Sequence, residues 1–273
     1  MANDAALNPL PRATTATGIL SQATRNPWLL ALVAVLAVVL WWNATNSVPR
    51  AFAYLWQWLP ALLRGLGVNI QISVLAVALG TAVGLVVGAL SLSPVHGVRV
   101  LSRSYVQIFR NAPTLVLIYF TTYVFPFELQ LVSWTFPFPD WLKVVLGLAL
   151  PTSANVAEIF RGAIQSIPSA QWEAAQSLAF RRSQIFRLVV LPQCVRRMLP
   201  PWMNLYASIT MSTSLASLVG VHDVVDTAQI ASNTVARTDF TILVYFTLLG
   251  LFFAYCYPIA RATRALEKRH ERY

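Results

Sequence analysis

Long apolar runs constrain this chain more than any other feature, because about 20 mostly apolar residues form a helix that crosses a bilayer core. We predict six such helices, at residues 28–42, 68–92, 106–125, 141–164, 200–221 and 240–259. Only 11% of the 273 residues are charged, whereas a soluble domain carries about 25%. So little charge cannot cover a water-facing surface. The sequence therefore predicts an all-α, multi-pass membrane protein.

The first run, "WLLALVAVLAVVLWW" at residues 28–42, is short for a membrane span. Its terminal Trp pair suits the membrane interface. It also resembles the apolar core of a signal peptide, because Arg12 and Arg25 precede it. No convincing small-x-small cleavage site follows, so the sequence favours an uncleaved helix.

The distribution of basic residues predicts the orientation, because Lys and Arg are enriched in cytoplasmic loops. With the N-terminus inside, the six helices put both termini in the cytoplasm. Arg50, Arg64, Lys143 and Arg237 would then lie outside, and the other sixteen of the twenty basic residues would lie inside. The segment 122–140 would form an outside interfacial loop. The opposite orientation would reverse this bias.

Three glycines in the second run are spaced for close helix packing. Gly80, Gly84 and Gly88 fall at i, i+4 and i+8, on one face of a helix. Small residues at this spacing let two backbones approach in a membrane, where hydrophobicity does not drive helices together. We therefore expect a neighbouring helix against this face.

Several kinds of chemistry have no matching pattern in this sequence. The net charge of +10 is spread around the apolar runs, which argues against nucleic-acid binding. Cys194 and Cys256 form neither a disulfide framework nor a metal-ligand spacing. Neither Lys143 nor Lys268 follows a glycine-rich phosphate loop. We therefore predict no catalytic residues, no metal and no cofactor in this chain.

Polar residues within the predicted helices are the candidates for a solute path. Glu158 and Arg161 are three residues apart and are predicted to share a helix face and to pair. Ionisable groups at membrane depth usually face a protein interior or a watery path, although this pair could instead anchor the helix near the headgroups. Helix hydroxyls can equally bond to their own backbone. The predicted path comprises Asn155, Glu158, Thr213, Ser214 and Ser217.

The segment 171–193 lies between two apolar runs and is predicted to be cytoplasmic. Trp172, Ala175, Leu178 and Ala179 fall on one face of a short helix. This face could lie on lipid or dock in a groove of a partner, and its small alanines favour a protein groove. Pro192 is expected to end the helix built from "IFRLVVL", because proline lacks the N–H donor.

Within this segment, "EAAQSLAFRRSQIFRLVVLPQ" resembles the EAA motif of permease subunits in ABC-type importers. The segments "IFRNAPTLVLIYF", "AEIFRGAIQSIP" and "TSLASLVGVHDVVDTAQ" resemble the polar amino-acid branch (the histidine/glutamine/glutamate type) of that family. Ala179 occupies the motif's glycine position. Alanine at positive φ costs about 1 kcal/mol more than glycine, so we predict either a right-handed turn there or a slightly different loop.

The resemblance implies a type I importer permease: a five-helix core at residues 51–260, preceded by an added helix within residues 1–50 and followed by a basic cytoplasmic tail at 261–273. It implies a cytoplasmic coupling helix that contacts a partner ATPase. The implied coupling residues are Glu173, Ala174, Ala175, Ala179, Leu191 and Pro192.

The other implied partners are a second permease subunit, identical or paralogous, and a solute-binding protein. ATP and Mg²⁺ would bind to the ATPase, and this chain would sit in the bacterial inner membrane. The alternative function is an ion-coupled or passive transporter that acts without an ATPase.

Overall fold

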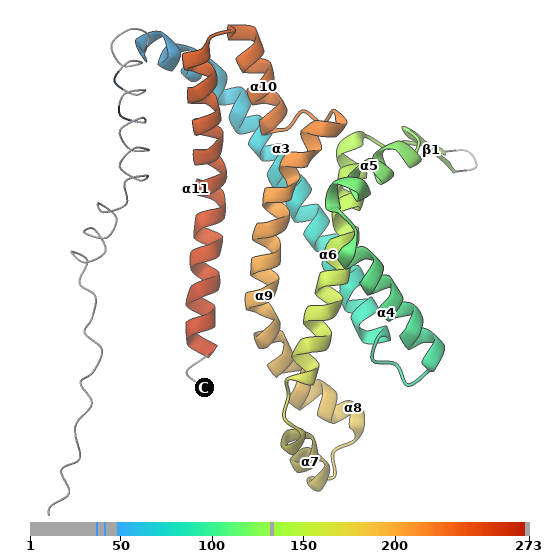
Figure 1. Ribbon diagram of the computed structural model, residues 1–273. Coiled ribbons are helices and arrows are strands. Elements are labelled where there is room, and N and C mark those ends of the chain that lie inside the picture. The colour runs from blue at the N-terminus through green and yellow to red at the C-terminus, as the bar shows by residue number, and fades with distance from the viewer. Residues whose placement is uncertain (1–36, 38–40, 42–47, 132–133, 271–273) are drawn as a thin grey trace, which may run out of the picture. The chain divides into compact units, whose positions relative to one another are not determined.

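The computed structural model describes residues 37, 41, 48–131 and 134–270, and the chain divides into two units, residues 1–53 and residues 54–273. The predicted helix at 28–42 lies outside the described residues, apart from Ala37 and Trp41. In chain order, the elements are α3 (Val48–Leu90), α4 (His96–Asn111), α5 (Thr114–Val124), β1 (Glu128–Leu131), β2 (Trp134–Pro137), α6 (Asp140–Gln165), α7 (Ser169–Ser177), α8 (Arg182–Gln184), the π-helix η1 (Ile185–Val190), α9 (Leu191–Ser212), the 3₁₀ helix η2 (Thr213–Val219), α10 (Val224–Val235) and α11 (Thr238–His270) (Figure 1).

Helix α3 is longer than the predicted second span. Its 43 residues correspond to about 65 Å of helix, roughly twice the thickness of a bilayer core. The predicted span 68–92 is the second half of this helix. Arg64 was expected in an outside loop, but it lies within α3, where its Nε donates to the Pro60 carbonyl at 3.4 Å. The assignment of Arg64 to a loop is wrong because a single proline need not end a helix, whereas its location outside stays a prediction.

The predicted third span, 106–125, is two helices. α4 ends at Asn111 and α5 begins at Thr114, with Ala112 and Pro113 in extended conformations between them. Proline disfavours the helical conformation of the residue before it, which explains the break. At 11 residues, or about 16 Å, α5 alone is shorter than a bilayer core. The prediction of one continuous helix is therefore wrong.

The glycine face of α3 packs against α6, as predicted. A Cβ atom added to Gly80 would lie 2.5 Å from Thr152, and one added to Gly84 would lie 2.5 Å from the Ser153 carbonyl. One added to Gly88 would lie 2.9 Å from Phe160. Only glycine fits these contacts. Successive glycines meet successive turns of α6, so the two helices run parallel.

The predicted interfacial loop between α5 and α6 contains an antiparallel hairpin, in which Glu128 pairs with Pro137. A buried lysine holds the base of this hairpin. The Lys143 ammonium lies 3.0 Å from Asp140 and 3.8 Å from the ring centroid of Phe127. Burial of an ammonium group costs free energy unless it has such partners.

The last two predicted spans also differ at their ends. The fifth was predicted at 200–221, but α9 begins at Leu191 and passes into η2 after Ser212. The sixth, at 240–259, lies within α11, and this helix continues to His270 through most of the predicted tail.

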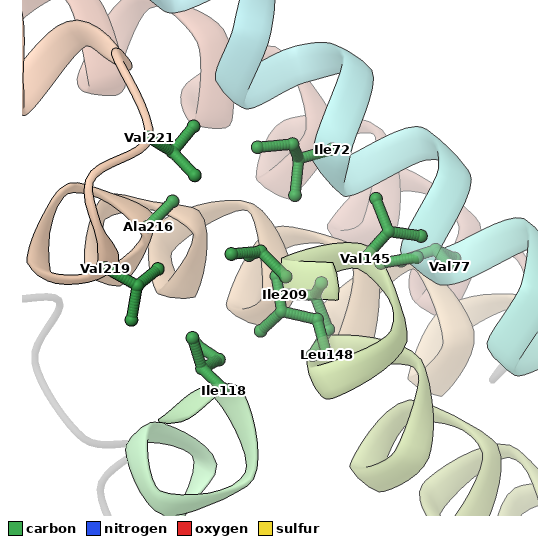
Figure 2. Close-up of a cluster of buried hydrophobic side chains, with 11 residues drawn as sticks. Ile72, Val77, Ile118, Val145, Leu148, Ile209, Ala216, Val219 and Val221 are labelled. Atoms are coloured by element: carbon green, nitrogen blue, oxygen red, sulfur yellow. The ribbon is translucent and has the colours of Figure 1, made fainter. Parts of the chain in front are cut away.

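Side chains from α3, α5, α6, α9 and η2 form the core of the second unit. Ile72, Ile118, Leu148 and Ile209 meet at its centre (Figure 2). Of the long apolar helices, α6 is the most enclosed, because 67% of its most apolar 18-residue stretch is buried, whereas in α11 only 11% of that stretch is buried. α11 lies along α9 at the periphery (Figure 1). By length and composition, three of the described helices can cross a bilayer: α3, α6 and α11.

Candidate functional site

Helix α7 is attached to the end of α6 by an apolar cluster of its own. Ala175 is buried together with Ile167 and Ile185, and Trp172 packs against the same cluster. This chain itself therefore covers the first half of the face that was predicted to contact lipid or a partner, and Ala179 stays exposed. Leu178, which was assigned to that face, is 70% exposed.

The opposite side of α7 is exposed in the part of the chain that the structure describes. Glu173 and Ala174 are both exposed, next to the buried Ala175. Arg197 of α9 donates to the carbonyl of Ser166 at 2.7 Å, which fixes the turn between α6 and α7. The motif thus has one anchored residue and two that are presented to the surroundings.

Ala179 ends α7 in a left-handed conformation, with a φ of 59°. Its N–H donates to Gln176 at 2.8 Å, and the N–H of Phe180 donates to Ala175 at 3.2 Å. These two bonds define a Schellman motif, whose left-handed position favours glycine. The expectation of a right-handed turn is wrong: the glycine geometry is kept although alanine occupies the position.

Pro192 does not end a helix as predicted. The π-helix η1 leads directly into α9, which begins at Leu191 with Pro192 in its first turn. Pro192 follows the π-helical turn, in which the Leu191 N–H still donates to the Phe186 carbonyl five residues back, so its missing N–H falls where the wider π-type bonds end. Leu191 is half-buried and Pro192 is exposed.

A polar hollow of about 220 Å³ lies between α4 and α6. Glu158 and Arg161 pair along its α6 wall, as predicted: Arg161 Nε donates to Glu158 Oε2 at 3.1 Å, and Nη2 of the same guanidinium donates to Oε1. Arg110 approaches Oε1 at 3.8 Å. The lining residues are Ser91, Arg103, Val106, Gln107, Arg110, Ala157, Glu158 and Arg161.

The other residues of the predicted path do not line this hollow. Asn155, one turn before Glu158, donates to the Pro151 carbonyl at 2.8 Å. Ser214 and Ser217 donate to carbonyls three residues back. Thr213 is fully buried and donates to Thr210 at 2.7 Å. None of these four therefore lines the hollow with Glu158, and only Asn155 shares its helix.

Thr213 belongs instead to a closed polar cluster that the sequence reasoning missed. Asn69 donates to Thr213 at 3.1 Å and to Asp223 Oδ2 at 3.0 Å, and it accepts from the Val224 N–H at 3.0 Å. Asp223 caps α10 by accepting from the Asp226 N–H at 2.8 Å. Burial raises the pKa of Asp223, although its hydrogen bonds oppose that shift. The Asp-x-x-Asp spacing before α10 was the available signal.

Arg103 and Arg110 were also missed. They fall at i and i+7 of α4, with Gln107 between them at i+4, so all three share one helix face. The sequence carried this spacing, but the predicted helix began at residue 106 and did not include Arg103.

The fold and these features define a membrane-embedded transport subunit rather than an enzyme. Residues 76–272 match the family described as the binding-protein-dependent transport system inner membrane component. The chain belongs to this family and is an ABC transporter permease of the amino-acid import group, a multi-pass inner-membrane protein.

Individual relatives agree with this assignment. The octopine transport system permease protein OccM of Rhizobium radiobacter is 33% identical over 79% of this chain and 88% of its own length. The probable amino-acid ABC transporter permease protein YckA of Bacillus subtilis is 29% identical over 78% and 91%. A crystal structure of an amino acid ABC transporter with histidines matches with a TM-score of 0.69 and 25% identity, over 80% of this chain and 98% of that chain.

Proposed function

We propose that this chain is the transmembrane permease subunit of an ATP-driven importer for a polar amino acid or a related compound. The observation that carries the proposal is the coupling segment. α7 is anchored to the end of α6 through Ala175 and presents Glu173 and Ala174 outward. A rigidly attached helix can transmit motion to the membrane helices, whereas a loosely tethered one cannot.

The charge distribution supports a cytoplasmic position for α7 and a six-span topology. Arg161, Arg181, Arg187 and Arg197 lie in or beside α7 and its neighbours. The opposite end carries Asp140, Asp223, Asp226 and Asp239 beside only a few basic residues. Because cytoplasmic ends are rich in Lys and Arg, the α7 end faces the ATPase. The parallel packing of α3 and α6 suits two helices that both run inward.

In the proposed mechanism, a solute-binding protein delivers the solute to the outer end of a pair of permease subunits. ATP and Mg²⁺ bind to the partner ATPase subunits, which close and move the coupling helices together. The permease pair changes from inward-open to outward-open, and the coupling is a free energy shared between two distant sites. Asn155 and Glu158 face the solute path in this proposal, and Ser214 and Ser217 of η2 line it further along. Thr213 is fully buried and would support the path from behind.

Reconstitution tests the proposal directly. The purified chain is placed in liposomes with and without its ATPase, and uptake and ATP hydrolysis are measured with the solute-binding protein present. Both activities should require the complete complex. Uptake by this chain alone, driven by an ion gradient, would overturn the proposal in favour of a self-sufficient transporter.

A charge reversal tests the coupling helix separately. Glu173→Lys should weaken co-purification with the ATPase at least tenfold, with membrane insertion unchanged, because a charge pair at an interface contributes on the order of 1.5 kcal/mol or more. Glu128→Lys is the matched control: it makes the same change on an exposed residue of β1, at the other end of α6. Equal co-purification of both variants would exclude Glu173 from the contact.

A further inference from the structure

The hollow between α4 and α6 carries an excess of positive charge. Three arginines and one glutamate line it, so its net charge is +2 (3 − 1). The side chains of Arg103, Gln107 and Arg110 are exposed, so their donor groups are open to a ligand. A ligand that supplies negative charge would match this excess.

The one carboxylate of the hollow is already occupied. Both oxygens of Glu158 accept from Arg161, and the remaining nitrogen of that guanidinium, Nη1, donates to Gln165 at 2.9 Å. Glu158 and Arg161 therefore neutralise each other. This pair leaves little free acceptor capacity for the ammonium group of a solute.

Two guanidinium groups on α4 stay uncompensated. The closest approach of Arg110 to Glu158 is 3.8 Å, which is longer than a hydrogen bond. Arg103 forms no ion pair or hydrogen bond within the described residues. Gln107 lies between them on the same face, and its oxygen accepts from Asn111 at 3.1 Å, so its NH₂ group is left to donate. The two guanidinium groups and the NH₂ group of Gln107 can only donate hydrogen bonds. Guanidinium groups bind carboxylates in a bidentate manner.

From this arrangement, and resting on the proposed import function, we propose that the solute bears two carboxylates and that Arg103 and Arg110 select it. The solute class is an acidic amino acid or a dicarboxylate derivative of an amino acid. The volume of about 220 Å³ equals that of about seven waters in the liquid, enough for such a group. A cationic side chain would meet like charge and no free carboxylate.

Binding without the solute-binding protein tests this inference, because that protein imposes a selectivity of its own. Radiolabelled L-glutamate, L-glutamine and L-arginine are titrated against the full chain in nanodiscs of neutral phospholipid. Glutamate should bind at least tenfold more tightly than glutamine, which differs only by its amide, and arginine should bind most weakly. Arg103→Gln and Arg110→Gln should each reduce the preference for glutamate about fivefold or more.

Arg99→Gln is the matched control. It removes the same charge from the same helix, but Arg99 bonds to the Ser93 carbonyl and to His96 and does not line the hollow. The preference for glutamate should survive this change. Equal affinity for glutamate and glutamine, absence of glutamate binding, or an equal loss in Arg99→Gln would each overturn the inference.

Two further measurements test whether the hollow binds inorganic phosphate or a lipid headgroup instead of an amino acid. If inorganic phosphate displaces glutamate at equal concentration, the hollow is a general anion site and the inference fails. If phosphatidylglycerol in the nanodiscs abolishes glutamate binding in the wild type but not in the arginine variants, the hollow holds a lipid headgroup and the inference also fails. ATP-driven uptake by the complete complex, without any preference for glutamate in the binding assay, would overturn this inference and leave the proposed function intact.

Discussion

Two polar sites flank the core of the second unit, and they differ in how fully their groups are satisfied. In the closed cluster, Asn69, Thr213 and Asp223 are each 0% exposed, and each finds partners within the cluster. In the hollow, the side chains of Glu158 and Arg110 are 32% and 43% exposed, and among the described residues neither Arg103 nor Arg110 is hydrogen-bonded to a carboxylate. A saturated cluster holds helices together, whereas an unsaturated one has capacity left for a ligand.

The largest expected effect lies in the closed cluster. Asn69→Leu keeps the branching of the side chain at Cγ but removes three hydrogen bonds, which leaves Asp223 and the Val224 N–H buried with fewer partners. An unsatisfied buried polar group costs about 1–3 kcal/mol, so we expect a loss of about 2–4 kcal/mol in the free energy of unfolding, measured by SDS titration in mixed micelles. Asn155→Leu, which removes a single bond to a helix carbonyl, should cost less than about 1 kcal/mol. Equal losses of stability in the two variants would contradict the special role of the closed cluster.

The same cluster should make stability depend on pH. Burial raises the pKa of Asp223 above its usual range, so the folded state holds this proton to higher pH than the unfolded state does. Between the ordinary and the raised pKa, stability therefore falls as pH rises, by at most about 1.4 kcal/mol per pH unit. Asp223→Asn should flatten this slope in unfolding titrations taken from pH 4 upward. An unchanged slope in the variant would assign the titration to another group.

In the hollow, the expected effect is on transport rather than on stability. Glu158→Gln removes the only negative charge of the hollow and should change solute affinity or uptake about fivefold. The free energy of unfolding should change by less than about 1 kcal/mol, because the ion pair is partly exposed.

The matched control uses the other ion pair of α6, between Asp140 and Lys143. Asp140→Asn removes the partner of Lys143, which is fully buried, so it should lower stability and leave uptake kinetics unchanged. If Glu158→Gln left the kinetics of uptake unaltered, the Glu158–Arg161 pair would serve only as an anchor of the helix.

The sequence predicted what short-range patterns determine. The glycine face of α3, the bounds of α6 and the Glu158–Arg161 pair all follow from helical periodicity, and the structure confirms them. Family resemblance located α7. These features need no knowledge of how distant segments meet.

The features that the sequence did not predict depend on contacts between distant segments. Asn69 and Asp223 are 154 residues apart, and no local pattern pairs them. Arg103 and Glu158 line the same hollow only because α4 packs against α6. The burial of Ala175 and the partial burial of Trp172 on the predicted docking face were missed, because their partners come from α6, η1 and α9. The predictions therefore failed at tertiary contacts rather than at helix formation.

The smallest expected effect concerns the backbone of the coupling segment, which lies outside both polar sites. Ala179→Gly should stabilise the end of α7 by about 0.5–1 kcal/mol, because glycine adopts the left-handed conformation at φ 59° without a steric cost. Ala174→Gly is the matched control: it makes the same change at an exposed position within the right-handed part of α7 and should destabilise the helix by a similar amount. Hydrogen exchange of the Phe180 amide, which bonds across the motif to Ala175, reports both changes. Opposite signs in the two variants would show that the strain resides in the φ of Ala179, and destabilisation by both would contradict this account of the turn.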